Sequence, residues 1–125
     1  MSDLNTLERL EIIRQRFTID RVEIQLAGLA ANLARVSSFV ENPANAKAVS
    51  GLLVESKFMI EWIASNVSLE MQEQLVELQL QLAVWSRGNL NSEEISEQAE
   101  GWSERVLEMS GIRPERSRLN CSRNL

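Results

Sequence analysis

The sequence predicts an all-α fold, an antiparallel four-helix bundle with a long N-terminal helix and a short basic C-terminal tail. Apolar residues recur every three or four positions through most of the chain, the spacing that places side chains on one face of a helix. Only two prolines and five glycines occur in 125 residues, so long helices are rarely interrupted. We expect one helical domain, residues 1–112, followed by a polar, arginine-rich tail, residues 113–125.

Residues 4–41 are predicted to form one long helix. Its main apolar face consists of Ile12, Ile19, Val22, Leu26, Leu29, Leu33, Val36 and Val40. At about 1.5 Å per residue this helix spans about 57 Å, whereas the next helix, residues 43–67, spans only about 36 Å. The N-terminal part therefore extends beyond its antiparallel neighbour and exposes the side chains of Leu4, Leu7, Leu10, Ile12, Ile13 and Phe17.

These exposed N-terminal side chains need other residues to bury them, and two arrangements would do so. A second copy of the chain would cover them in a homodimer. Alternatively, the helix breaks near residues 18–20, where Asp20 and Glu23 resemble a capping box, and the first segment folds back. We favour the homodimer, because no glycine or proline marks a break at this point.

The second helix is predicted to begin at Asn42 and Pro43, a cap residue followed by a proline at the first helical position. Its apolar seam consists of Val49, Leu53, Ser56, Ile60, Ile63 and Val67. Counting antiparallel from the turn places Gly51 level with Ala34. Because both residues are small, we predict that the first two helices approach closely at this level.

The third helix, residues 69–87, is predicted to begin after the cap Ser68 and to end at Gly88. It carries two apolar stripes on opposite sides. One consists of Met71, Leu75, Leu78, Leu82 and Trp85, and the other of Leu69, Val76, Leu80 and Ala83. A helix that is apolar on two sides is either central in the fold or offers one side to a partner.

The last helix, residues 92–110, is predicted to begin with a capping box formed by Asn91 and Glu94. Its apolar stripe is narrow and consists of Ile95, Ala99, Trp102, Val106 and Met109. The remaining faces carry many glutamates, as expected for a helix at the edge of the fold.

Composition excludes several chemistries. The chain has no histidine, the commonest general base and metal ligand, and its single cysteine, Cys121, excludes an internal disulfide. A net charge of −5 disfavours binding to nucleic acid or to an anionic membrane. The N-terminus lacks the pattern of a secretion signal, and no apolar stretch is long enough to span a membrane. We therefore expect an acidic cytoplasmic protein, non-enzymatic and without a cofactor or metal.

Three carboxylates offer an enzymatic alternative. Glu93, Glu94 and Glu97 follow a Glu-Glu-x-x-Glu pattern, which resembles the start of the metal site in all-α nucleotide pyrophosphohydrolases of the MazG type. The resemblance implies Mg²⁺-dependent hydrolysis of a nucleotide diphosphate bond. The sequence departs from the family pattern because no Glu-x-x-Asp follows, aspartate occurring only at Asp3 and Asp20.

The tail offers a second alternative, an adaptor for nucleic acid or for an acidic partner. Its basic side chains are Arg113, Arg116, Arg118 and Arg123. They are not interleaved with aromatic residues, and the acidic body opposes contact with phosphates, so this pattern is weak for nucleic-acid binding.

The preferred hypothesis is a small helical interaction or regulatory module that is homodimeric through its first helix and binds a helix of a partner protein. The first candidate contact residues are Leu4, Leu7, Leu10, Ile13 and Phe17. The second set is Leu69, Val76 and Leu80.

Overall fold

The computed structural model describes residues 6–88 and 90–112, and no strand occurs among them. The helical elements are α1 (Thr6–Ile19), α2 (Val22–Phe39), the short 3-10 helix η1 (Pro43–Asn45), α3 (Ala46–Ala64), α4 (Leu69–Ser86) and α5 (Ser92–Ser110). The predicted all-α class is therefore confirmed for this part of the chain.

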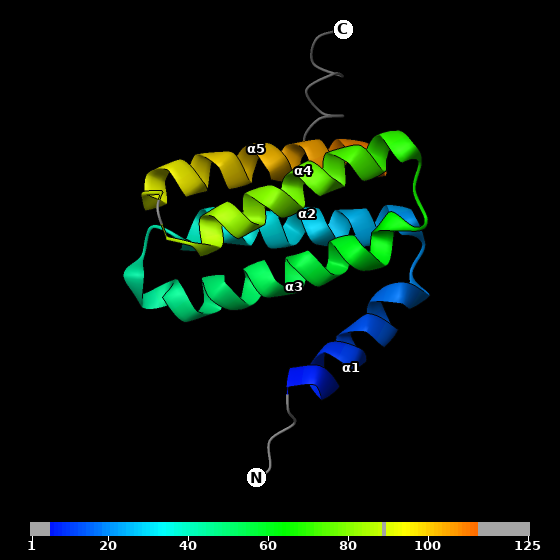
Figure 1. Ribbon diagram of the computed structural model, residues 1–125, viewed down its shortest axis with the longest axis horizontal. Coiled ribbons are helices and arrows are strands. Elements are labelled where there is room, and N and C mark those ends of the chain that lie inside the picture. Colours follow the sequence, from blue (N-terminus) through cyan, green and yellow to red (C-terminus); the bar gives the residue numbers. More distant parts are fainter. Residues whose placement is uncertain (1–5, 89, 113–125) are drawn as a thin grey trace, which may run out of the picture.

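Helices α2, α3, α4 and α5 lie alongside one another, and each runs opposite to the one before it (Figure 1). Helix α2 packs against α3 and, most extensively, against α5, while α4 packs against α3 and more lightly against α5. Helix α1 stands apart from these four. It contacts α3 and diverges from the other helices toward its N-terminus (Figure 1).

The prediction of one uninterrupted helix over residues 4–41 is wrong, because the chain turns at Asp20 and Arg21, between α1 and α2. Arg21 is extended, with φ −66° and ψ 158°, and its side chain caps nothing, so the capping box predicted for Asp20 and Glu23 does not form. The break therefore arises from another interaction.

Gln25 holds the turn between α1 and α2. Its Nε2 donates to the backbone carbonyls of Phe17, at 3.3 Å, and Asp20, at 2.9 Å. Carbonyls at a helix end have no partner within the helix, so a buried amide that binds them stabilises a break without glycine or proline. The break of the second alternative is therefore observed, and α1 contacts α3, but Leu7 and Ile12 on α1 stay exposed.

The turn between α3 and α4 repeats this arrangement. Gln72 Nε2 donates to the carbonyls of Ala64, at 2.8 Å, and Val67, at 3.3 Å. Both glutamines therefore bind the carbonyls eight and five residues before them, and each lies four residues after its helix's N-cap, Arg21 or Ser68. The same hydrogen bonding of a glutamine amide to two backbone carbonyls therefore stabilises two turns of different sequence.

The core lies between α2, α3, α4 and α5, and the predicted stripes supply it. The buried residues at predicted positions include Leu26, Leu29, Leu33, Val36, Val49, Leu53, Ile60, Ile63, Leu75, Leu78, Leu82, Trp85, Ile95, Ala99 and Val106. Asn32 and Ser56 are buried with them. Asn32 Nδ2 donates to Glu55 Oε1 at 3.1 Å, and Asn32 Oδ1 accepts a hydrogen bond from Arg35 at 3.0 Å. This bonding satisfies the buried amide.

The closest helix contact is between α2 and α5, and small residues make it. Ser37 and Ser96 each donate a hydroxyl hydrogen bond to the other's backbone carbonyl at 2.9 Å, and Ser103 Oγ donates to the carbonyl of Ala30 at 2.8 Å. The close approach predicted between Gly51 and Ala34 is wrong. Both residues are exposed, and a Cβ built on Gly51 meets nothing within 4 Å.

Candidate functional site

Helix α4 is apolar on two sides, and only one of them faces the core. Leu75, Leu78, Leu82 and Trp85 are buried on the inner side. On the opposite side Leu69, Val76 and Leu80 are 72%, 56% and 66% exposed, and Val84 continues the row. We call Leu69, Val76, Leu80 and Val84 the outward face of α4. The structure thus brings Leu69, Val76 and Leu80, the second predicted contact set, onto one solvent-facing surface.

The orientation of α4 is fixed at both ends. At its start, Ser68 Oγ accepts a hydrogen bond from the Met71 N–H at 3.2 Å, and Gln72 binds the end of α3. Near its end, Trp85 Nε1 donates to Gln98 Oε1 of α5 at 2.8 Å. Because the inner side is anchored in this way, the outward face is held toward solvent without a conformational change.

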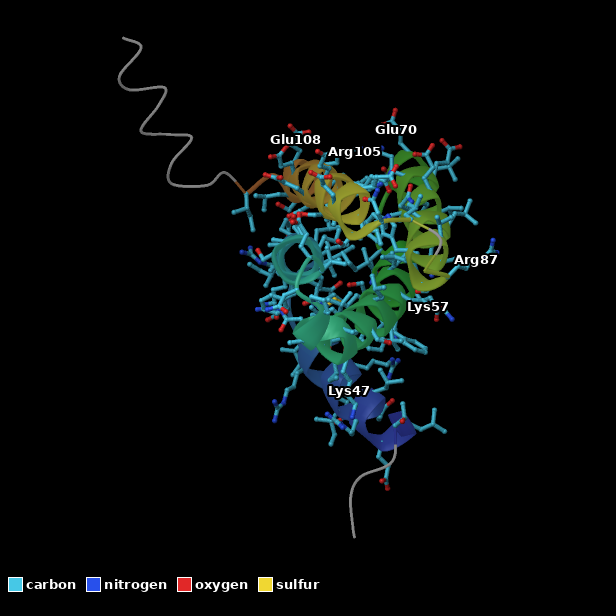
Figure 2. The ribbon with its side chains drawn as sticks, turned by 90° about the vertical axis from the view of Figure 1, so that its left-hand side faces the viewer. Lys47, Lys57, Glu70, Arg87, Arg105 and Glu108 are labelled. Carbon is cyan, nitrogen blue, oxygen red and sulfur yellow. The ribbon has the colours of Figure 1, made fainter. Side chains whose placement is uncertain are left out.

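The edge of this face toward α5 is acidic. Glu70 and Glu77 lie along it, and Glu77 Oε1 is 3.6 Å from the guanidinium of Arg105 on α5. Figure 2 shows Glu70 on α4 and Arg105 on α5 at the same end of the molecule. Within residues 6–88 and 90–112, neither Glu70 nor Glu73 forms an ion pair. The charges of Glu70 and Glu73 are therefore not neutralised by an ion pair within the described helices, whereas that of Glu77 is partly offset by Arg105.

Glu73 lies within the outward face itself. It is four residues after Leu69 and three before Val76, so the three side chains are neighbours on the helix surface. Glutamines lie along the opposite edge, toward α3, where Gln79 Nε2 donates to the backbone carbonyl of Lys57 at 3.4 Å. Neither Val84 nor Glu73 is among the predicted contact residues, although Val84 stands four residues after Leu80, at the spacing that continues the row.

The first predicted contact set is divided by the structure. Phe17 is buried, with its ring centroid 5.7 Å from that of Trp62. Leu10 and Ile13 are partly buried and line an open hollow between α1 and α3 with a volume of about 510 Å³. Leu7 is exposed, and Leu4 lies outside the described residues. The set does not form one continuous surface.

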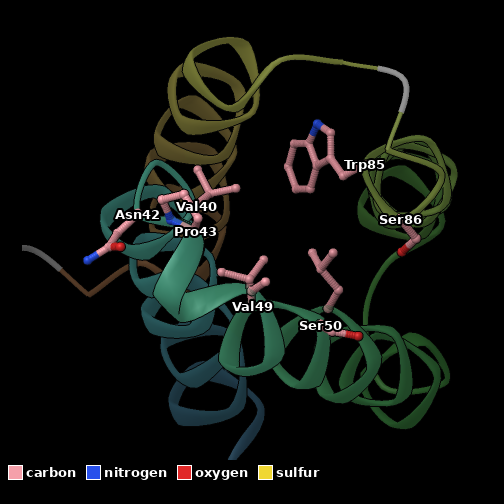
Figure 3. Close-up of a pocket in the computed structure, with 9 residues that line it drawn as sticks. Val40, Asn42, Pro43, Val49, Ser50, Trp85 and Ser86 are labelled. Carbon is pink, nitrogen blue, oxygen red and sulfur yellow. The ribbon is translucent and has the colours of Figure 1, made fainter.

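A smaller hollow of about 240 Å³ lies beside η1, where Val40, Val49 and Trp85 form apolar walls (Figure 3). Two of the three polar side chains that line it, those of Asn42 and Ser86, are already bonded within the chain. Asn42 Oδ1 accepts from the Ala44 N–H at 3.0 Å, and Ser86 Oγ donates to the carbonyl of Leu82 at 2.9 Å. The hollow therefore offers mainly apolar contacts.

The three carboxylates of the enzymatic alternative are exposed on the first turns of α5. Glu94 completes the predicted capping box, which is confirmed. Its Oε1 accepts from the Asn91 N–H at 3.3 Å, and its own N–H donates to Asn91 Oδ1 at 2.8 Å. Among the described residues, no group of three or more His, Cys, Asp or Glu side chains is arranged to hold a metal ion.

The arginines of the predicted electrostatic tail, Arg113, Arg116, Arg118 and Arg123, lie outside the described residues. None of the helices in the described part of the chain is long and apolar enough to cross a membrane. Comparison of the chain with protein-family models, curated proteins and solved structures found no match. The surface chemistry of the helices is therefore the basis for a functional hypothesis.

Proposed function

We propose that this chain is a cytoplasmic, non-enzymatic interaction module in which α2–α5 form an antiparallel four-helix bundle and the outward face of α4 binds a helix of a partner protein. The observation that carries this proposal is the exposure of Leu69, Val76 and Leu80 on a helix whose other side is anchored in the core.

The energetics favour a partner at this face. Full burial of one Leu or Val side chain contributes roughly 1.5–3 kcal/mol relative to exposure, so three such residues can support measurable binding. From Leu69 to Val84 the row extends about 22 Å at 1.5 Å per residue, which matches several turns of a partner helix. The spacing is that of helix-in-groove and helix-on-helix recognition.

This function can be tested by phage-display selection from a library of helical peptides. Peptides selected against the natural protein are expected to lose binding to Leu80→Ser and to retain binding to Leu7→Ser, in which an exposed leucine of α1 is changed in the same way. Both substitutions lie at exposed positions, so the two variants should melt at the temperature of the natural protein. Peptides that bind Leu80→Ser as well as the natural chain would refute a role for α4.

The hollow between α1 and α3 supports a second candidate, the predicted homodimer. Leu10 and Ile13 of α1 face Leu52 and Val54 of α3 across it, and a helix from a second copy would cover these side chains. Sedimentation equilibrium of the full chain, compared with Leu10→Lys, tests it. A dimer that Leu10→Lys converts to a monomer supports this candidate, and a monomer at high concentration excludes it.

A further inference from the structure

The charges around the outward face of α4 indicate what kind of partner fits it. The face has an acidic edge toward α5, formed by Glu70 and Glu77, and an acidic residue, Glu73, within the apolar row; the nearby cations, Lys57 on α3 and Arg87 after the end of α4, lie at the opposite edge and at the C-terminal end. An uncharged apolar helix docked here would remove the Glu73 carboxylate from water without giving it a partner, which is costly. A cationic side chain opposite Glu73 removes this cost.

A second copy of the chain fits this face poorly for reasons of symmetry. Two α4 helices paired in parallel by a two-fold axis place Glu73 level with Glu73 of the other copy. Two antiparallel helices related by a two-fold axis bring their acidic edges together, so that Glu70 and Glu77 line the same side in both copies. Either arrangement places like charges side by side, and the occupant is therefore a different chain.

We propose that the outward face of α4 binds an amphipathic helix that carries a lysine or arginine opposite Glu73 and further basic side chains along the edge facing Glu70 and Glu77. This proposal rests on the proposed function and defines the chemistry of the partner. The apolar stem of a lysine or arginine lies along Leu69 and Val76 while its charge reaches the carboxylate. Arg105 on α5 already approaches Glu77, so Glu70 and Glu73 are the principal sites for the partner's charge.

Two designed, fluorescein-labelled helical peptides test the proposal. They share one leucine stripe and differ only along one edge, which carries lysines in the first peptide and glutamines in the second. We measure the anisotropy of each peptide during titration with the full chain, in roughly 0.05 M and roughly 0.5 M salt. At low salt the lysine peptide is expected to bind about five- to tenfold more tightly than the glutamine peptide, because two or three partly exposed ion pairs contribute about this much. The preference should shrink at high salt.

Variants of the protein show which residues produce the preference for the lysine peptide. Glu73→Gln should remove most of the preference for the lysine peptide. Glu100→Gln, an exposed glutamate on α5 that takes part in no interaction with α4, should leave the preference unchanged. Leu80→Ser should lower the affinity of both peptides about tenfold or more. The free energy lost with one buried leucine exceeds the roughly 1.4 kcal/mol that a tenfold change in affinity represents.

The outcomes separate the two proposals. If the two peptides bind with equal affinity and Leu80→Ser lowers both affinities, the inference of a partner with a basic edge is overturned, while the proposed function stands. Absence of binding by either peptide, or binding that Leu80→Ser does not change, would overturn both. A natural protein that dimerises and becomes monomeric with Leu80→Ser would show that the occupant is a second copy, which also overturns the inference.

Discussion

The ring of Phe17 lies 5.7 Å from the ring of Trp62, at an interplanar angle of 53°, and this contact attaches α1 to α3. Phe17 is the buried residue of α1, whereas the other large side chains of the helix are partly or fully exposed. Phe17 is therefore the main apolar anchor of the first helix, beside the hydrogen bonds of Gln25 that fix the turn.

Phe17→Ala should release α1 and lower the free energy of unfolding by about 2–4 kcal/mol, somewhat less than the roughly 3–5 kcal/mol typical of buried aromatic truncation because α1 is peripheral. Hydrogen exchange of α1 amides should accelerate while α2–α5 stay protected. Urea denaturation and exchange measurements check this, with Ile12→Ala as the exposed control. If exchange in α1 is unaltered by Phe17→Ala, the aromatic contact is not what holds the helix.

Gln25→Ala should destabilise the turn between α1 and α2, because the carbonyls of Phe17 and Asp20 lose a buried donor. The expected cost is about 1–3 kcal/mol. Gln72→Ala removes the equivalent donor between α3 and α4 and should cost a similar amount. Urea unfolding of both variants measures the two costs. Changes below about 0.5 kcal/mol in both would show that the amides do not fix the turns.

Much of the fold could be predicted from residue spacing. The buried positions of α3 and α4, from Val49 to Trp85, follow the predicted stripes, and the caps at Ser68 and Asn91 form as predicted. These features depend on local periodicity and on side chains three residues apart, which a sequence displays directly.

The break between α1 and α2 could not be predicted in the same way. Asp20 and Glu23 indicated a break, but no capping box forms, and the turn depends on Gln25 reaching carbonyls eight and five residues earlier. A glutamine in a helical stretch has no spacing that distinguishes it from a surface residue. Similarly, Gly51 and Ala34 were paired by counting along a straight hairpin, whereas the small residues of α2 meet those of α5, far away in sequence.

The candidate surface was partly accessible from sequence. Two stripes on α4 indicated that one side was available to a partner, and Leu69, Val76 and Leu80 are exposed as that hypothesis requires. Helical spacing alone places Glu73 beside Leu69 and Val76, but which of the two stripes faces solvent depends on how α4 is rotated against α3 and α5. Rotation is set by tertiary contacts such as Trp85 with Gln98.

Ala99→Leu should disrupt the contact between α2 and α5. Ala99 is fully buried beside the serine contacts that hold the two helices together, so the larger side chain has no space. We expect a loss of about 1–3 kcal/mol from overpacking. Thermal unfolding followed by circular dichroism measures it, and Ala31→Leu, at an exposed position of α2, is the control. An unchanged melting temperature for Ala99→Leu would contradict the close packing.

Glycine substitutions should have opposite effects at two positions. Gly51→Ala should stabilise the protein by about 0.5–1 kcal/mol, since the helix interior favours alanine and nothing lies within 4 Å of the new Cβ. Gly111→Ala should destabilise by a similar amount, because Gly111 ends α5 with φ 76°. Urea unfolding compares the two variants. Stabilisation by Gly111→Ala would show that the left-handed helix end is not required.

Chemical-shift mapping shows residue by residue whether the outward face of α4 is the interaction surface. The ¹⁵N-labelled full chain is titrated with the lysine-edged peptide, and the amide shifts are followed residue by residue. We expect the largest shifts on residues 69–84, and Glu73→Gln should reduce them. Shifts confined to Leu10, Ile13 and Leu52, around the hollow between α1 and α3, would contradict this expectation.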